Sequence, residues 1–161
     1  MYREDDTPYS PQGKTPDRLK SYVDEEGNLN PANPNGKATI QDHVRGSHPR
    51  KSDSPYTSTS AELEAGKSYG DHEIRINARD LERDVNSGKV KDVEIIKHDK
   101  VVEHLDAKRA AAQERYDRNP TIENQKRLQR STMDIANAKR DKEILVKGKV
   151  PAKYVSVKKK P

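Results

Sequence analysis

Short runs of alternating apolar and polar residues interrupt an otherwise polar chain. The clearest is at 72–77, where Ile74 and Ile76 fall on the same side of an extended segment. The first four residues are too few to be assigned from pattern alone. Further short runs, rich in β-branched or aromatic residues, predict strands at 56–60, 93–96, 143–146 and 154–157.

Residues 99–140 follow a different period. Their apolar residues recur at helical spacing, and Asn119-Pro120 interrupts the pattern. We expect Asp99 to cap the first helix and Asn119 the second, with Pro120 at the first helical position. Two helices joined so closely form an antiparallel hairpin. The apolar positions are Val102, Leu105, Ala112, Tyr116, Leu128, Ile135 and Ala138.

Shorter helices are expected elsewhere. Thr15-Pro16-Asp17 has the N-cap and proline of a helix start, which predicts a helix from Arg18 to Val23. Helical turns are also predicted at 38–46, 61–65 and 81–85, with polar loops at 5–37 and 47–55 around them. The whole pattern, 1–161, predicts a single α+β domain with an antiparallel or mixed sheet.

Composition narrows the kind of protein. Hydrophobic residues make up 29% and charged residues 37%, and Phe, Trp and Cys are absent, so the core is expected to be thin. Without Cys there is no disulfide scaffold, thiol chemistry or Cys-based metal site. No apolar run approaches the length of a membrane span, so no membrane partner is expected. The histidines outside the motifs described below show no ligand spacing, so no metal site is predicted.

The net charge of +5 is concentrated at the C-terminal end. Residues 141–161 hold seven Lys against Asp141 and Glu143, which accounts for the whole excess. We interpret 153–161 as a solvated Lys-rich tail. A basic RNA-binding or interaction module, using this tail and the helical hairpin, is the non-enzymatic alternative.

Four motifs stand in a fixed order along the chain, and each is weak when taken alone. Their order and spacing carry more weight than any single residue. The motifs are Tyr2-Arg3 followed by acidic residues and Pro8, Asp42-His43-Val44-Arg45-Gly46, Tyr56-Thr57-Ser58-Thr59-Ser60, and Asp141-Lys142-Glu143-Ile144 followed by Gly148-Lys149-Val150-Pro151.

In this order the motifs resemble the catalytic domain of cholera-type mono-ADP-ribosyltransferase toxins, the Arg / Ser-Thr-Ser / Glu class. The resemblance covers nearly the whole chain except 99–140, and it extends to Thr15-Pro16-Asp17. It implies an ADP-ribosyltransferase-like β core with flanking helices, NAD as co-substrate, and a helical hairpin inserted at about 99–140.

The chemistry of NAD agrees with the residue types. Cleaving the bond between nicotinamide and ribose leaves positive charge on the sugar, which a carboxylate such as Glu143 stabilises. Arg3 is suited to the pyrophosphate, and Ser58 to orienting Glu143. The predicted catalytic residues are Glu143, Asp141, Ser58 and Arg3, and the predicted cofactor-binding residues are Arg3, Glu4, His43, Ser58, Thr59 and Ser60.

Two departures from the family leave the acceptor open. Asp141 stands where the arginine-modifying members have Glu, so a hydroxyl acceptor, on protein or RNA, becomes an alternative. Asp141 is expected to act as a general base or as the salt-bridge partner of Lys142 or Arg140. The hairpin at 99–140 replaces a target-contacting loop, and either supports the sheet or recognises the target.

We therefore expect a toxin domain that transfers ADP-ribose from NAD to a macromolecule in the attacked cell. An NAD glycohydrolase toxin is the enzymatic alternative. No secretory signal follows Met1, which favours delivery as part of a larger secreted protein that acts in the cytoplasm of the target cell. Through the resemblance to polymorphic toxin tips, a cognate immunity protein is an expected partner.

Overall fold

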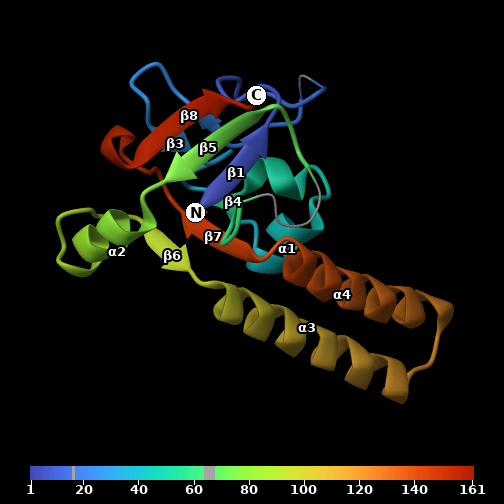
Figure 1. Cartoon of the computed structure of the whole chain (residues 1–161). Coiled ribbons are helices and arrows are strands. Elements are labelled where there is room, and N and C mark those ends of the chain that lie inside the picture. Colours follow the sequence, from blue (N-terminus) through green and yellow to red (C-terminus); the bar gives the residue numbers. More distant parts are fainter. Residues whose placement is uncertain (16, 64–67) are drawn as a thin grey trace.

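The computed structural model describes residues 1–15, 17–63 and 68–161, and its centre is an antiparallel sheet (Figure 1). The strand order is β6-β7-β4-β1-β5-β8, and each adjacent pair runs antiparallel. An α+β fold is confirmed, with the sheet antiparallel rather than mixed. The strands are β1 (Tyr2–Asp5), β4 (Tyr56–Ser60), β5 (His72–Ile76), β6 (Glu94–Ile96), β7 (Glu143–Lys147) and β8 (Val155–Lys159).

The predicted helical hairpin is confirmed, but its caps lie elsewhere. Lys97, not Asp99, is the N-cap of the first helix, and it makes no side-chain capping bond. The hydroxyl of Thr121 caps the second by accepting from the Asn124 amide, two residues after the predicted cap. The helices are α1 (Ile40–Arg45), η1 (Arg50–Asp53), α2 (Ala78–Asn86), α3 (His98–Arg118), α4 (Ile122–Arg140) and η2 (Ala152–Tyr154).

The helix predicted from Arg18 to Val23 does not form. Tyr22–Val23 is instead strand β2, paired with β3 (Leu29–Asn30) in a small second sheet. The reason is burial, because Val23 and Leu29 both lie in the core and an extended pair places them there together. Pro16, which belongs to the predicted start of this helix, lies outside the described residues.

Of the other predicted short helices, some are present in the structure and one is not. The turn at 38–46 is confirmed as α1, and the one at 81–85 is part of the longer α2. Residues 61–63 form a bend and turn rather than a helix, and residues 64–65 of that prediction lie outside the described part. The predicted loop at 47–55 contains the 3-10 helix η1.

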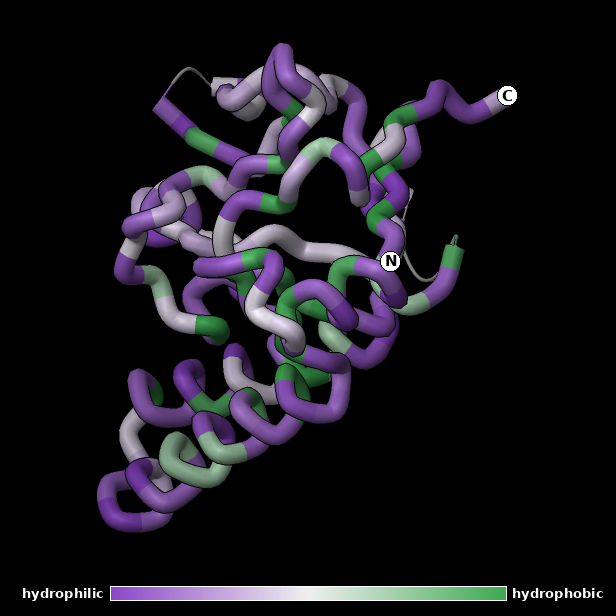
Figure 2. The backbone as a smooth tube through the Cα atoms, turned by 90° about the vertical axis from the view of Figure 1, so that its left-hand side faces the viewer, coloured by the Kyte–Doolittle hydropathy of each residue, from purple (hydrophilic) through white to green (hydrophobic). Residues whose placement is uncertain are grey.

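Two apolar clusters hold the sheet, one on each face. Leu145 and Val146, adjacent on β7, belong to different clusters because strand residues alternate between faces. One cluster packs the root of the hairpin, through Val101 and Leu105, against the sheet. Figure 2 shows that the part of the hairpin far from the sheet is mainly hydrophilic, so its root carries the packing.

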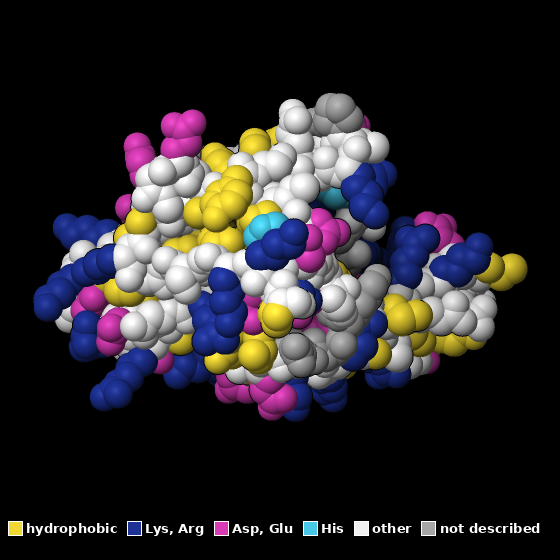
Figure 3. All heavy atoms as spheres, turned by 45° about the horizontal axis from the view of Figure 1, so that its top comes forward, with side chains coloured by type: hydrophobic (Ala, Val, Ile, Leu, Met, Phe, Trp, Pro, Cys, Tyr) yellow, Lys and Arg dark blue, Asp and Glu magenta, His cyan; other side chains and the backbone are white. Residues whose placement is uncertain are grey.

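The Lys-rich C-terminal end continues as the edge strand β8 as far as Lys159, paired with β5. The predicted solvated tail at 153–161 is therefore largely structured. On the face shown in Figure 3, Lys and Arg side chains alternate with Asp and Glu and do not form one continuous basic area. In the described ranges, no helix combines the length and apolar character of a membrane span.

Candidate active site

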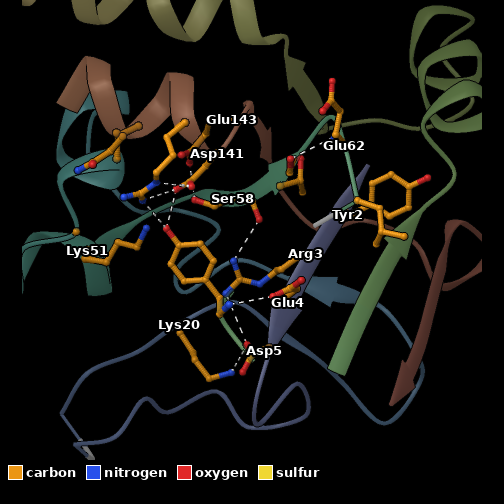
Figure 4. A pocket seen from close by; sticks show the side chains of 18 residues that line it. Tyr2, Arg3, Glu4, Asp5, Lys20, Lys51, Ser58, Glu62, Asp141 and Glu143 are labelled. Carbon is orange, nitrogen blue, oxygen red and sulfur yellow. Dashed lines mark hydrogen bonds and ion pairs between the residues drawn. The ribbon is translucent and has the colours of Figure 1, made fainter. Parts of the chain in front are cut away.

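A cavity of about 440 Å³ lies against the centre of the sheet and is lined by Arg3, Ser58 and Glu143 (Figure 4). The sheet topology explains this convergence. Strands β1, β4 and β7 are neighbours, although Arg3 on β1 and Glu143 on β7 are 140 positions apart in the chain. The volume is within the range of small-molecule sites.

Ser58 and Glu143 form the central contact of the cavity. In the β4–β7 register, Ser60 lies opposite Glu143 and Ser58 opposite Leu145, so Ser58 and Glu143 are diagonal neighbours on one face. The Ser58 hydroxyl donates to Glu143 Oε1 at 2.7 Å. The resemblance carried by the motif order predicted that these two residues meet, and the strand register supplies the physical reason.

Glu143 is buried, with only 8% of its surface exposed. Burial raises the pKa of the carboxyl group, and the Ser58 hydrogen bond and the charge of Lys51 act in the opposite direction. A carboxylate held in this setting is poorly solvated, so its charge acts strongly on a neighbouring positive centre.

Arg3 lies beside the Ser58–Glu143 pair. One guanidinium nitrogen, Nη1, donates to the Ser58 carbonyl at 3.2 Å, and Nη2 lies 3.6 Å from Asp5 Oδ2. Burial lowers the pKa of Arg3, against the opposing charges of Asp5 and Glu143. Its Nε is buried without a hydrogen-bond partner among the described residues. Arg3 also lines the cavity, and its guanidinium charge suits an anionic ligand.

His43 lies behind Ser58 and is not among the residues that line the cavity. The ring is almost fully buried, and its two nitrogens contact hydroxyl groups: Nδ1 is 2.6 Å from Ser54 Oγ and Nε2 is 2.7 Å from Ser58 Oγ. A capping box between Thr39 and Asp42 fixes the start of α1, which carries the ring. His43 therefore acts on the cavity through Ser58.

Lys51 is a cavity residue that the sequence patterns did not indicate. Its Nζ donates to the His43 carbonyl at 2.8 Å and lies 3.0 Å from His43 Nε2. Burial brings the pKa of the amine down to about 7; the charge of Glu143 acts against this shift and that of Arg3 adds to it. Lys51 lies in a polar segment without periodicity, so only the fold brings it here.

Asp141 lies at the rim of the cavity, at the C-terminal end of α4. Arg140 Nε donates to its Oδ1 at 2.9 Å, and the Tyr69 hydroxyl donates to its Oδ2 at 2.6 Å. Of the two expected salt-bridge partners, the structure places Arg140 on Asp141, whereas Lys142 lies 3.7 Å from Glu62. Both oxygens of Asp141 are thus engaged.

The remaining predicted residues also line the cavity, but their side chains have local partners. Glu4 Oε2 accepts from the Tyr69 amide at 2.9 Å and from Ser68. Burial raises the pKa of Glu4, but these hydrogen bonds together with Lys160 lower it overall. Thr59 donates to the Ile144 carbonyl at 2.8 Å, and so joins β4 to β7. Ser60 accepts from the backbone of Glu62. These contacts shape the walls around the central pair.

With this geometry in place, the chain was compared with protein families, characterised proteins and solved structures. None of the three comparisons found a match. The site itself combines a buried carboxylate, a hydroxyl bonded to it and an arginine on the cavity lining. Within the described ranges, no three His, Asp or Glu side chains are grouped as metal ligands.

Proposed function

We propose that this protein cleaves NAD and transfers ADP-ribose to a macromolecule. The observation that carries the proposal is the convergence of Arg3, Ser58 and Glu143 on one cavity, with Glu143 buried and bonded to Ser58. These are the residues for which the resemblance to ADP-ribosyltransferase toxins implies roles in catalysis.

The reaction needs a negative charge close to the nicotinamide ribose. When the bond between the nicotinamide nitrogen and ribose C1 breaks, its electron pair leaves with nicotinamide and the sugar becomes positively charged. The Glu143 carboxylate is suited to stabilise this charge, because it lines the cavity and is largely shielded from water. An acceptor then bonds to C1 and loses its proton.

Arg3 suits the other end of the substrate. NAD carries a pyrophosphate, which guanidinium groups bind by charge-assisted hydrogen bonds. Arg3 is held by the Ser58 carbonyl and Asp5, and its buried Nε still lacks a partner among the described residues. Because Arg3 lines the cavity, a phosphate bound there would lie beside its guanidinium charge, which makes the site compatible with NAD.

The hairpin supports a macromolecular acceptor. Three residues near the C-terminal end of α4, Asn137, Arg140 and Asp141, line the cavity. A protein or an RNA bound along the hairpin would therefore reach the cavity rim. The toxin role, delivery within a larger protein, action in the cytoplasm of the attacked cell and a cognate immunity protein follow from the resemblance and are part of this proposal.

Labelled NAD tests the proposal. We expect the wild-type protein to release nicotinamide and to label a macromolecule in a cell lysate, and protease or nuclease treatment then identifies its class. Glu143→Gln and Arg3→Lys should lose both activities, whereas Glu25→Gln, at an exposed position, should keep them.

Each other outcome points to a different conclusion. Nicotinamide release without a labelled macromolecule would indicate the glycohydrolase and contradict the transfer step. Intact NAD in the presence of folded wild-type protein and lysate would overturn the proposal. RNA binding that is unchanged by Glu143→Gln, without NAD cleavage, would support the non-enzymatic basic module.

A further inference from the structure

Four side chains form a continuous line of contacts from η1 to β7. Lys51 Nζ lies 3.0 Å from His43 Nε2, and that nitrogen lies 2.7 Å from Ser58 Oγ. Ser58 then donates to Glu143 Oε1 at 2.7 Å. At the other side of the ring, Nδ1 lies 2.6 Å from Ser54 Oγ. Figure 4 shows Lys51 reaching toward the Ser58 and Glu143 side of the cavity.

Each of these contacts needs one hydrogen, and the supply is limited. Burial, with the charges of Lys51 and Arg3, holds the pKa of His43 well below its usual value, so the ring is neutral and has one N–H. Ser58 has a single proton, which it gives to ionised Glu143. The contact between His43 and Ser58 then requires the ring proton to be on Nε2.

A charged Lys51 conflicts with that arrangement. An ammonium group only donates, so the contact at 3.0 Å requires Nε2 to be an acceptor. The ring proton then moves to Nδ1 and is donated to Ser54. One of the two short contacts of Ser58, with Nε2 or with Glu143, is left without a hydrogen.

An uncharged Lys51 removes the conflict. The amine still donates to the His43 carbonyl, and its lone pair is available toward the Nε2 proton. The Nε2 proton is then shared between Ser58 Oγ and the Lys51 nitrogen, the other two contacts have one hydrogen each, and the donors run in one direction, from Ser54 through His43 and Ser58 to Glu143. We propose that Lys51, in its uncharged form, is a positioning residue that directs the His43 proton to Ser58 and the Ser58 proton to Glu143.

The charged groups around Lys51 come from several elements. Glu143 on β7 and Arg3 on β1 act on its amine, and His48 lies just before η1. Arg50, beside Lys51 on η1, pairs with Asp42 of α1 at 3.5 Å. The pKa of Lys51, about 7, puts its change of charge within reach of an ordinary titration.

The tautomer of His43 is a direct test, and NMR chemical shifts of the imidazole nitrogens and carbons measure it. As the pH rises through the lysine's pKa of about 7, the wild-type ring should change from Nδ1–H to Nε2–H. Lys51→Met has no charge and should keep Nε2–H throughout. Lys51→Arg is always charged and should keep Nδ1–H throughout. Lys89→Met, at an exposed lysine, should behave as wild type.

A wild-type ring that keeps one tautomer across this range would overturn the proposal, as would a change of tautomer that persists in Lys51→Met. If Lys51→Met does not fold, the wild-type titration and Lys51→Arg still decide the question. None of these readouts requires NAD, so they are independent of the proposed function.

A second readout rests on the proposed function. NAD cleavage by the wild type should increase about tenfold per pH unit below the pKa of Lys51, as one group loses its proton. Lys51→Met should lose that dependence, and Lys51→Arg should remain slow throughout. A wild-type rate that is flat over this range, with the tautomer change present, would remove the catalytic consequence and leave the positioning in place.

Discussion

Glu143 lies where a carboxylate is poorly solvated, and its neighbours compensate only in part. The Ser58 hydroxyl and the charges of Lys51 and Arg3 favour the ionised form, but burial outweighs them and the pKa of Glu143 is raised. The native state therefore binds the proton of Glu143 more tightly than the unfolded chain does. Ionisation at neutral pH consequently lowers the stability of the fold.

Glu143→Gln should therefore stabilise the protein at neutral pH. Below the unfolded pKa of 4.5 the glutamate is neutral in both states, so the gain is small there. It should appear as the pH rises from 4.5 to the raised native pKa, and it amounts to about 1.4 kcal/mol per unit of pKa shift. Urea unfolding at acid and neutral pH measures it, with Glu25→Gln as the control. A variant no more stable than wild type at neutral pH would contradict the buried, ionised Glu143.

At the scale of elements, the turn between α4 and β7 aims Glu143 at the cavity. Lys142 adopts a left-handed backbone conformation, with φ of 50°, directly before Glu143. Its carbonyl accepts from the amide of Ala61, which ties the turn to the segment after β4. A similar turn follows β7, where Gly148 has φ of 93° and an added Cβ would lie 2.2 Å from the Asp92 carbonyl oxygen. Both ends of β7 are thus set by backbone geometry.

Because a lysine is strained in this conformation, Lys142→Gly should stabilise the fold by about 0.5–1 kcal/mol. Lys139→Gly is the matched control, since Lys139 is an exposed residue of helix α4, where glycine should cost about 1 kcal/mol. Chemical denaturation of both variants measures the two changes. Loss of stability in Lys142→Gly comparable with that in Lys139→Gly would show that the turn is not strained.

Sequence periodicity predicted strands β4 to β8 and the hairpin because each of these elements carries its own repeating pattern, whereas β1, β2 and β3 were not predicted from pattern. The site needed more than pattern. Ser58 and Glu143 meet through the register of β4 and β7, and motif order pointed to them only because a known family shares it. Lys51 carries no local signal, since its contact with His43 depends on the path of the loop after α1.

The helix predicted at 18–23, which does not form, also shows that a local pattern does not determine contacts between distant residues. Its start signal was local, but pairing with β3 and burial of Val23 and Leu29 decided the outcome. Both cap positions of the hairpin were displaced by two residues for a related reason. The apolar stripe fixes which helix face is buried, whereas the ends depend on single hydrogen bonds such as that of Thr121.

At the scale of the whole molecule, the hairpin has two parts that differ in packing and polarity. Its root is packed against the sheet through Val101, Leu105, Ile135 and Ala138. Its outer part is polar and projects away from the body (Figures 1 and 2). Since the root alone belongs to the apolar core, the outer part is available for a macromolecular partner.

Replacing the outer hairpin, residues 110–131, with a short Gly-rich loop should leave the body folded. We expect NAD cleavage to persist and labelling of the macromolecule to fall by about tenfold or more, because the hairpin would no longer recruit the acceptor. A matched variant with the same deletion and Glu143→Gln controls for background cleavage. Unchanged labelling would assign the hairpin a purely structural role.

The most direct measurement of the central claim is nicotinamide release from NAD by purified wild type and Glu143→Gln. The account predicts release by the wild type, and a rate lower by about 100-fold or more in the variant, whose fold is retained or stabilised. Equal rates in the two proteins, or intact NAD with wild-type protein in the presence of its acceptor, would contradict the assignment of Arg3, Ser58 and Glu143 as an NAD-cleaving site.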